Sequence, residues 1–347
     1  MTLSRWKIAL PVVLASTLAL AACGGGSETA AGGGGGGTKT LRLGHIFPES
    51  SPVHTAATTF ASDVSTRTGG SVKVTVFPGG ALGGDAEAGQ SLIRGELDCA
   101  MLNHPAAGMD PRLQLGFLPY VVSSYEAADK IFYGEGMIAA NDRKVLEEIG
   151  VHALAFYEND FRGLTNNKRT VTSPQDLSGL KIRVPELPAY VNLFKAWGAQ
   201  PLPIAFPELY TALQQGTVDG QDNGIVLTFD SKFQEVQKYF TRTNHAYGTG
   251  VLACSKKVYD TLTPEQKTQL TEAAEAAAKA QVQANRAGVQ ERLDGLKAAG
   301  VEVTELTPAQ VDAFRAVRDD VWNAYSGTFG ADFLAQLRKA ADEAEGA

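Results

Sequence analysis

The stretch SPQDLSGLKIRVP, residues 173–185, holds a complete helix-to-strand unit. Ser173 is a typical N-cap residue, Pro174 suits the first helical turn that follows it, and Gly179 suits the end of the short helix. The next residues, Lys-Ile-Arg-Val at 181–184, alternate polar and apolar side chains as a half-buried strand does, and a proline then ends the run. The stretch therefore predicts a short helix that leads directly into a strand.

The same alternation of helices and strands extends outward in both directions. Apolar spacing predicts strands at 41–45, 72–77 and 97–102 and helices at 53–67, 85–94, 189–197 and 207–215. Strands that alternate with helices in this order are typical of an α/β protein with a largely parallel sheet. We therefore expect the α/β class.

Two separate segments share one local pattern. QSLIRGELDCAMLN (90–103) and TALQQGTVDGQDN (211–223) each contain a helix end, a glycine, an aspartate three residues later and a strand that ends in asparagine. Residues 38–347 also exceed the length that one hydrophobic core usually serves. Together these features predict two lobes of similar topology.

The run from Thr263 to Gly300 is rich in Ala, Gln, Glu and Lys at helical spacing, and it begins with a capping box. A single helix of that length would measure about 54 Å at 1.5 Å per residue, which is longer than one small lobe. It must lie across both lobes or bend at Gly288. Two ordinary helices broken at Gly288 are the alternative.

The N-terminus indicates export. Arg5 and Lys7 precede an uncharged run over residues 8–22, which is too short to span a membrane comfortably but suits a signal peptide. The run ends in Leu-Ala-Ala-Cys, and small residues before a cysteine resemble a bacterial lipobox, in which Cys23 becomes the lipidated N-terminus. An ordinary signal peptide with a chance cysteine is the alternative. We expect a lipoprotein signal peptide over 1–22 and a Gly-rich tether over 23–37.

The composition excludes several function classes. Cleavage after residue 22 removes two of the 31 basic residues and leaves 38 acidic ones, a net charge of −9 before the termini are counted, which argues against nucleic-acid binding. GxSxG, GxxxxGK[ST] and HExxH motifs are lacking, and the five histidines show no metal-ligand spacing, so we expect no enzyme activity, metal or cofactor. Cys99 and Cys254 form either a disulfide or two buried free thiols.

Four motifs bring a specific resemblance. RGLTN (162–166), DLSGLKIRVP (176–185), GAQPLP (198–203) and ELYTALQQGTVDGQDN (208–223) resemble the DctP-type substrate-binding proteins of TRAP transporters, and the resemblance covers essentially all of 40–300. It implies a type II periplasmic-binding-protein fold, in which two α/β lobes meet at a hinge and a long helix spans both. We expect residues 38–160 plus 249–288 in lobe I and residues 161–248 plus 289–347 in lobe II.

The resemblance also implies a binding site for one organic acid. Arg183 matches the arginine that clamps the ligand carboxylate, Arg162 matches a second basic contact, and Asn223 matches an amide that contacts the same carboxylate. Phe206 matches an aromatic residue that packs over the ligand, and Asn103 lies where relatives often carry Glu. The chain departs from the family at Gly224, where many relatives have Pro, and by one extra residue between the two arginines, which leaves the aim of Arg162 less defined.

The chemistry of Arg183 agrees with its implied role. It lies at the carboxyl end of the strand at 181–184, on the face opposite Ile182 and Val184, and ligands of open α/β sheets bind outside such strand ends. A planar guanidinium grips a carboxylate with two parallel hydrogen bonds, which a lysine cannot do.

The far end of the ligand is less defined by the sequence. Side chains that can hydrogen-bond to ligand hydroxyl groups are His45, Glu49, Asn103, Glu158, Asp160 and Asn166. They favour a sugar acid, such as a uronate or aldonate, over a C4-dicarboxylate, which would need a second cation such as Arg169.

We therefore expect an extracytoplasmic, lipid-anchored solute receptor, at the periplasm or the outer cell surface. It would act as a monomer that passes a small carboxylate to the integral membrane subunits of a TRAP transporter. The alternative is a ligand-binding partner of a sensor system with the same fold. A neighbouring operon that encodes one small and one large membrane protein favours transport, whereas a neighbouring sensor kinase favours sensing.

The lipid anchor gives a first testable prediction. Cys23→Ser removes the thiol that would carry diacylglycerol, so we expect a precursor that is neither lipidated nor cleaved by the lipoprotein pathway. Metabolic labelling with palmitate checks this, because the wild-type chain should incorporate label and the variant should not. A wild-type chain that takes up no palmitate would show that the anchor is absent.

Overall fold

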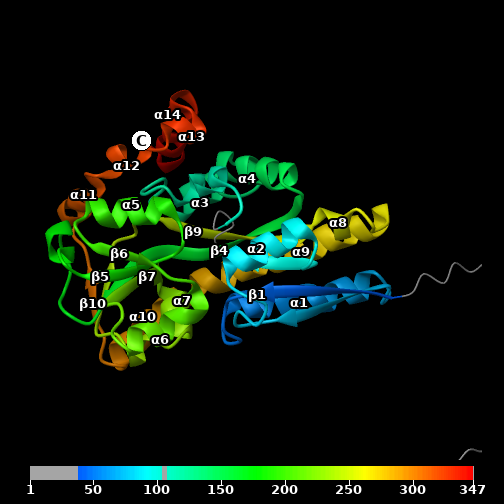
Figure 1. Ribbon diagram of the computed structural model, residues 1–347, viewed down its shortest axis with the longest axis horizontal. Helices are drawn as coiled ribbons and strands as arrows, with labels where there is room; N and C mark the ends of the chain where they lie inside the picture. Colours follow the sequence, from blue (N-terminus) through cyan, green and yellow to red (C-terminus); the bar gives the residue numbers. More distant parts are fainter. Residues whose placement is uncertain (1–37, 104–107, 347) are drawn as a thin grey trace, which may run out of the picture. The chain divides into compact units, whose positions relative to one another are not determined.

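The structure is a computed structural model that describes residues 38–103 and 108–346 (Figure 1). The expected signal peptide, Cys23 and the Gly-rich tether lie outside the described residues. The strands are β1 (Lys39–His45), β2 (Val72–Phe77), β3 (Cys99–Leu102), β4 (Val151–Asn166), β5 (Lys181–Val184), β6 (Gln200–Pro203), β7 (Gly220–Gly224), β8 (Tyr239–Arg242), β9 (Tyr247–Ser255) and β10 (Glu302–Glu305).

Helices connect and cover these strands. The α-helices are α1 (Pro52–Arg67), α2 (Asp85–Arg94), α3 (Tyr125–Ile131), α4 (Met137–Glu148), α5 (Pro188–Ala196), α6 (Leu209–Gln214), α7 (Ile225–Asp230), α8 (Lys256–Tyr259), α9 (Pro264–Ala287), α10 (Val289–Ala298), α11 (Pro308–Arg315), α12 (Arg318–Asn323), α13 (Ser326–Phe329) and α14 (Ala331–Glu345). Short 3-10 helices are η1 (Pro111–Phe117), η2 (Pro174–Leu177), η3 (Phe206–Glu208) and η4 (Phe233–Glu235).

The sheet contains two parallel groups of three strands with the same order. β2, β1 and β3 lie side by side in the first group, and β6, β5 and β7 lie side by side in the second. The 16-residue strand β4 joins them, because it pairs antiparallel with β9 near its start and with β7 and β8 near its end. We call β1–β3, β9 and the start of β4 the first region, and β5–β8, β10 and the end of β4 the second region.

The shared sequence pattern corresponds to a shared structure. Gly95 and Gly216 both end their helices with positive φ, at 74° and 70°, a conformation that glycine adopts without steric cost. Asp98 then accepts a hydrogen bond from the backbone N–H of Arg42 at 2.8 Å, and Asp219 accepts one from Lys181 at 2.9 Å. Each aspartate therefore links the start of its own strand to the neighbouring parallel strand in the same group.

Helices pack on both faces of the sheet. α1 and α9 cover one face of the first region, around Leu43, Phe60 and Leu270. α2 to α5 and the C-terminal helices contribute to a second, larger core that extends over the other face, around Leu102, Phe194 and Trp322. In Figure 1 α3 and α4 lie above β4 and β9, whereas α1 lies below these strands. Several buried polar side chains, including His45, Asn103 and Arg183, lie near the carboxyl ends of the parallel strands.

The helical run that the sequence predicted is divided at Gly288. α9 packs on the first region through Leu270 and Ala277, whereas α10 packs beside α7 in the second region through Leu293 and Leu296. Gly288 keeps helical angles, with φ −86° and ψ −6°, and its carbonyl accepts from the N–H of Arg292 at 3.2 Å. The run therefore contacts both regions. It consists of two consecutive helices, α9 and α10, that meet at Gly288.

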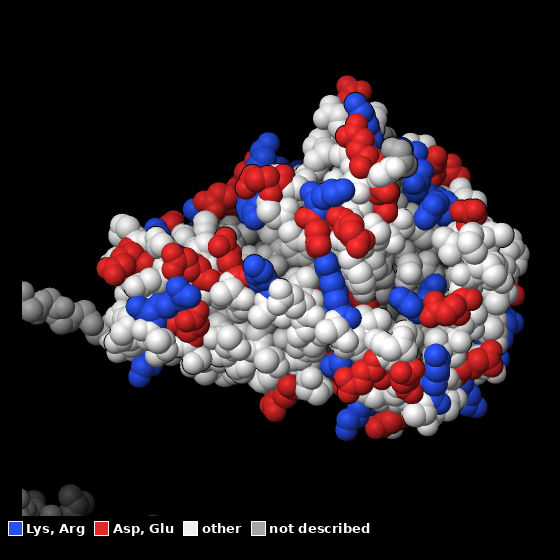
Figure 2. Space-filling view, turned by 180° about the vertical axis from the view of Figure 1, so that it is seen from behind, with Lys and Arg blue, Asp and Glu red and all other residues white. Residues whose placement is uncertain are grey.

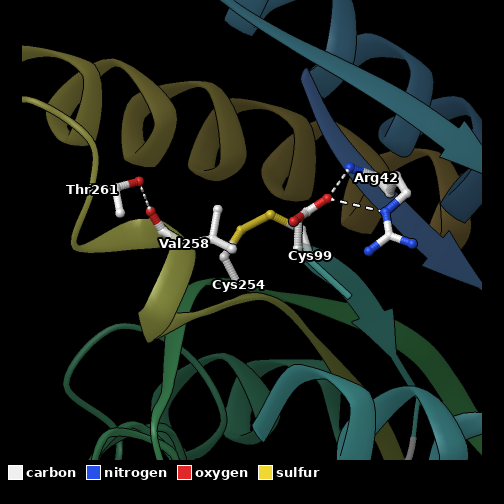
Figure 3. Close-up of a disulfide and its surroundings, with 6 residues drawn as sticks. Arg42, Cys99, Cys254, Val258 and Thr261 are labelled. Atoms are coloured by element: carbon white, nitrogen blue, oxygen red, sulfur yellow. Dashed lines mark hydrogen bonds and ion pairs between the residues drawn. A yellow bond between two sulfur atoms is a disulfide. The ribbon is translucent and has the colours of Figure 1, made fainter. Parts of the chain in front are cut away.

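Cys99 and Cys254 form a disulfide (Figure 3). They occupy directly opposite positions on the antiparallel strands β3 and β9. Both are buried, and Arg42 lies nearby at the first region's parallel pair. Strand register therefore decides the pairing that the sequence left open.

The disulfide gives a prediction about stability. The bridge joins residues 155 positions apart, so it removes many conformations from the unfolded chain. We expect Cys99→Ala combined with Cys254→Ala to lower the free energy of unfolding by about 2–5 kcal/mol. Urea unfolding of the exported protein, with and without reductant, measures this. A wild-type protein whose stability is the same in both conditions would contradict the prediction.

Candidate functional site

Arg183 is a buried guanidinium with unused hydrogen-bonding capacity. It lies in β5, is 2 % exposed, and its Nε donates to the carbonyl of Ile204 at 2.8 Å. Its Nη1 has no hydrogen-bond partner among the described residues, and no described carboxylate lies within ion-pairing distance of it. Burial lowers the pKa of Arg183 to about 10, and the charge of Arg162 adds to this effect, whereas Asp222 opposes it. This arginine can therefore accept an anionic partner.

Phe206 lies next to this guanidinium, in η3. The guanidinium carbon of Arg183 is 5.8 Å from the ring centroid of Phe206. The half-buried ring packs against the core beneath α1 and α9 and also against the small core around Phe233. Phe206 therefore touches both regions at one edge of the site.

The two regions meet beside Phe206. A Cβ on Gly84 would lie 3.6 Å from Cβ of Ala205, and a Cβ on Gly80 would lie 2.7 Å from Cγ of Pro207. The loop before α2 therefore touches the segment around η3. Side chains of both regions can enclose a small ligand at this contact.

Arg162 is held by an internal ion pair. It lies in β4 with no exposed surface, and its Nε donates to Oδ2 of Asp222 in β7 at 2.8 Å. The position opposite Arg162 in the strand pair is Gly224, so the diagonal approach to Asp222 is unobstructed. Burial acts against both charges, yet Arg162 and His245 hold the pKa of Asp222 well below its usual range.

This ion pair positions two further side chains. His245 lies 3.3 Å from Oδ2 of Asp222 through Nε2, and burial lowers its pKa despite that neighbour. Oδ1 of Asn223 accepts from Nη2 of Arg162 at 3.2 Å, and Nδ2 of Asn223 donates to Gln221 at 2.6 Å. The structure therefore brings Arg162 and Asn223 together, with Arg183 within electrostatic reach.

Asn103 and His45 lie at the ends of strands in the first region. Asn103 follows β3, is buried, and its backbone N–H donates to Oδ1 of Asp85 at 2.9 Å. His45 ends β1, is 4 % exposed, and its Nε2 lies 3.2 Å from Nδ1 of His54. Burial, followed by the charge of His54, lowers the pKa of His45 to about 4. Neutral imidazole is therefore the form at physiological pH.

Asp160 belongs to a different cluster. It adopts a left-handed conformation with φ 60°, and its Oδ1 accepts from the hydroxyl of Tyr125 at 2.6 Å and from the N–H of Phe161 at 2.7 Å. Burial raises the pKa of Asp160 to about 6. Its neighbour Glu158 accepts from Arg286 at 2.7 Å. These carboxylates therefore hydrogen-bond to α3 and α9.

Two other residues that the sequence proposed for the ligand's far end also have structural partners. Arg169, considered as a second cation for a dicarboxylate, donates to the carbonyls of Asp176 and Ser178 at 2.8 and 2.7 Å. Asn166 accepts from the N–H groups of Lys168 and Arg169 and shapes that turn. Arg169 thus stabilises a loop beside η2.

Three buried polar residues escaped the sequence-based prediction. Asp222 and His245 are 23 positions apart, and only the pairing of strands joins them. Tyr157 is fully buried in β4 with a hydroxyl that has no partner among the described residues. The one available signal was the position of Asp222 directly before Asn223, inside a motif that already pointed to the site.

Metal sites, membrane-spanning helices and charged patches are the remaining features of the described residues that bear on function. Within residues 38–103 and 108–346, no group of three His, Cys, Asp or Glu side chains is arranged to hold a metal ion. No helix in these ranges is both long and apolar enough to cross a membrane. Figure 2 shows acidic and basic side chains interspersed over the face in view.

Two α/β regions of matching strand order, with buried arginines on β4 and β5, define a bilobal solute-binding protein. The model of the family described as bacterial extracellular solute-binding protein, family 7 (DctP), matches residues 43–328. The chain belongs to this family, whose members are substrate-binding receptors of transporters rather than enzymes. The resemblance in the sequence motifs is thereby confirmed.

Individual relatives agree with this assignment. The chain is 34% identical over 311 residues to the 2,3-diketo-L-gulonate-binding periplasmic protein of Escherichia coli, covering 88% of this chain and 92% of that protein. A TRAP periplasmic solute-binding protein of Polaromonas, solved with D-erythronate, has a TM-score of 0.82 and 34% identity over 86% of this chain and 98% of its own. The sugar-acid-binding protein of Advenella mimigardefordensis, solved with galactonate, has a TM-score of 0.84 and 31% identity over 89% and 99%.

His45 gives a prediction about pH dependence. Its pKa is about 4 when folded and about 6.5 when unfolded, so below pH 6.5 the unfolded chain takes up a proton that the folded chain refuses. Stability should therefore fall as the pH drops from 6.5 to 4, by on the order of 3 kcal/mol for this group. In His45→Gln this contribution disappears. The free energy of unfolding in urea should therefore fall less steeply with decreasing pH than in the wild type.

The difference between the two proteins isolates His45, because the carboxylates and His245 titrate in both. Measurements at intervals between pH 7 and 4.5, without ligand, suffice. Parallel stability curves for the wild type and His45→Gln would show that the folded imidazole titrates normally.

Proposed function

We propose that this protein captures a small organic acid by an arginine clamp and delivers it to the membrane subunits of a TRAP transporter. The observation that carries the proposal is Arg183, a buried cation whose Nη1 has no partner among the described residues. A buried charge without a partner is costly, and a ligand carboxylate would supply both the opposite charge and two acceptors.

The neighbouring residues would complete the carboxylate site. Arg162 donates from Nε to Asp222 and from Nη2 to Asn223. We therefore propose that Arg162 is the second basic residue near the ligand carboxylate and that it also orients the Asn223 amide. Phe206, beside the Arg183 guanidinium, would pack over the carbon chain of the ligand. Asn103 and His45 would face the ligand from the first region.

A sugar acid is the ligand class that we favour. The relatives described above are named for diketogulonate or solved with erythronate and galactonate. Arg169, the cation that a C4-dicarboxylate would require, is already hydrogen-bonded to two backbone carbonyls. Oδ1 of Asp160 already accepts from Tyr125 and Phe161, so a ligand hydroxyl would have to donate to its Oδ2.

Capture would involve closure of two lobes about β4. We assign residues 38–160 and 249–288 to lobe I and residues 161–248 and 289–347 to lobe II. β4 has a register shift against β9 between Glu158 and Phe161, and Asp160 there has a positive φ, so the strand departs from regular geometry where the lobes join. Contact between Gly84 and Ala205 would correspond to the closed form.

The proposal places the receptor outside the cytoplasm. Membership of an extracellular solute-binding family supports this location. We infer that Cys23 carries a lipid, that residues 23–37 act as a tether, and that the receptor works as a monomer near the membrane subunits. The palmitate-labelling experiment tests the anchor separately from ligand binding.

The clamp gives a prediction about affinity. Arg183→Ala should weaken binding of the best organic acid by on the order of 2–5 kcal/mol, because the ligand charge would be buried without its partner. This corresponds to about thirtyfold to several thousandfold. Arg183→Lys should restore part of the loss, since it returns the charge but not the planar fork. Calorimetry, after a thermal-shift screen of organic acids, measures both.

Arg338→Ala provides a matched control. Arg338 lies in α14, pairs with Asp319 at 2.8 Å and stands over Trp322, so its loss should leave affinity unchanged. Thermal unfolding without ligand verifies that each variant is folded. Binding by Arg183→Ala within threefold of wild type would remove Arg183 from the site.

A further inference from the structure

Tyr157 is a buried tyrosine whose hydroxyl is directed to the end of β3. It lies in β4 opposite Gly250 of β9 and has no exposed surface. A Cβ on Gly250 would lie 2.4 Å from Oη of Tyr157 and 2.6 Å from the carbonyl oxygen of Leu102. The ring therefore crosses β9 above the glycine, and its hydroxyl lies near the last residue of β3, next to Asn103.

The Tyr157 hydroxyl has no hydrogen-bond partner among the described residues, and a second unpartnered polar atom lies nearby. Nδ1 of His45 is likewise buried without a partner in this part of the chain. Phe47 connects the two side chains, because its ring centroid is 6.2 Å from that of His45 and 5.9 Å from that of Tyr157. Buried polar atoms normally have partners, so the unpartnered hydroxyl of Tyr157 indicates a position that a ligand can complete, and His45 lies on the other side of Phe47 from it.

The charge of Asp85 links this cluster to the clamp. Burial raises the pKa of Tyr157, and Asp85 adds to that rise, while the same carboxylate is among the groups that oppose the lowering of the Arg183 pKa. Asp85 also accepts from the N–H of Asn103, which fixes it beside the end of β3. A ligand between Arg183 and Tyr157 would thus lie beside a cation and within reach of the Asp85 carboxylate.

We propose that Tyr157 is a specificity-determining residue that hydrogen-bonds a hydroxyl group at the end of the ligand remote from its carboxylate, with His45 beside it. Asp85 would repel a second carboxylate there, whereas a hydroxyl can donate to it. The ligand class is therefore a polyhydroxylated monocarboxylate. This inference rests on the proposed function and deepens it, since it assigns the first region to recognition of hydroxyls.

Tyr157→Phe tests the inference with D-erythronate, D-galactonate, L-gulonate and succinate as probes. Loss of one hydrogen bond should weaken the tightest of the three sugar acids about three- to tenfold. Succinate binding should change less than twofold. The melting temperature without ligand should stay the same or rise, because the variant removes a buried hydroxyl that lacks a protein partner. A purely structural tyrosine would instead lower it.

Tyr259→Phe is the matched control. Tyr259 belongs to the same core but stacks on His152 beyond β9, with ring centroids 3.9 Å apart. In Tyr259→Phe, neither the affinity for each probe nor the ratio of sugar-acid affinity to succinate affinity should change. Equal losses for sugar acid and succinate in Tyr157→Phe, or no loss, would overturn the inference. A wild type that binds succinate but none of the sugar acids would overturn it as well.

The outcome separates this inference from the proposed function. If Arg183→Ala abolishes binding while Tyr157→Phe leaves the ratio of affinities unchanged, the clamp stands and the role of Tyr157 is wrong. If the wild type binds no organic acid in the screen, both are wrong.

Discussion

The buried ion pair between Arg162 and Asp222 is the interaction on which the arrangement of the site depends. Neither side chain has exposed surface, and a charge in such a place is tolerated only with a partner and further hydrogen bonds. Arg162 therefore bonds to the Asp222 side chain and backbone and to Asn223. These bonds fix the end of β4 against β7 within the second region, and the same strand continues into the first region, where it pairs with β9.

The contrast between the two arginines gives the site its chemical character. Arg162 is compensated from within the protein, whereas Arg183 receives one backbone carbonyl and stands beside a second positive charge. The guanidinium of Arg183 is shielded from water and lacks an ion-pair partner among the described residues. An anion would satisfy it better than a neutral solute, and this electrostatic argument underlies the proposed carboxylate ligand.

Much of the fold was predictable because its signals are local. Caps, glycines at helix ends and alternating side chains act over a few residues, and they located the strands and the repeated Gly-Asp pattern. The position of Arg183 near the end of β5 was predictable too, since the strand pattern and a proline define it, whereas its role toward a ligand stays a prediction. The pairing of Cys99 with Cys254 was not, because it depends on the register between β3 and β9.

Contacts between residues that are distant in sequence could not be predicted from local signals for the same reason. Tyr157 and Gly250 are distant in sequence, and the space that the glycine leaves has meaning only once β4 and β9 are aligned. Asp160 adopts a conformation that usually favours glycine, so its residue type gave no indication of the irregular strand. Composition suggested it as a ligand contact, whereas the fold engages it with Tyr125.

The position of the disulfide has a topological consequence. Both cysteines belong to the first region, yet the covalent ring that they close contains β4 to β8, and with them most of the second region. In the oxidised chain, that region is an insertion whose two ends are held together by a covalent bond in addition to the pairing of β3 with β9. If it melts, the strands on either side cannot drift apart, and the first region remains as a template on which it can refold.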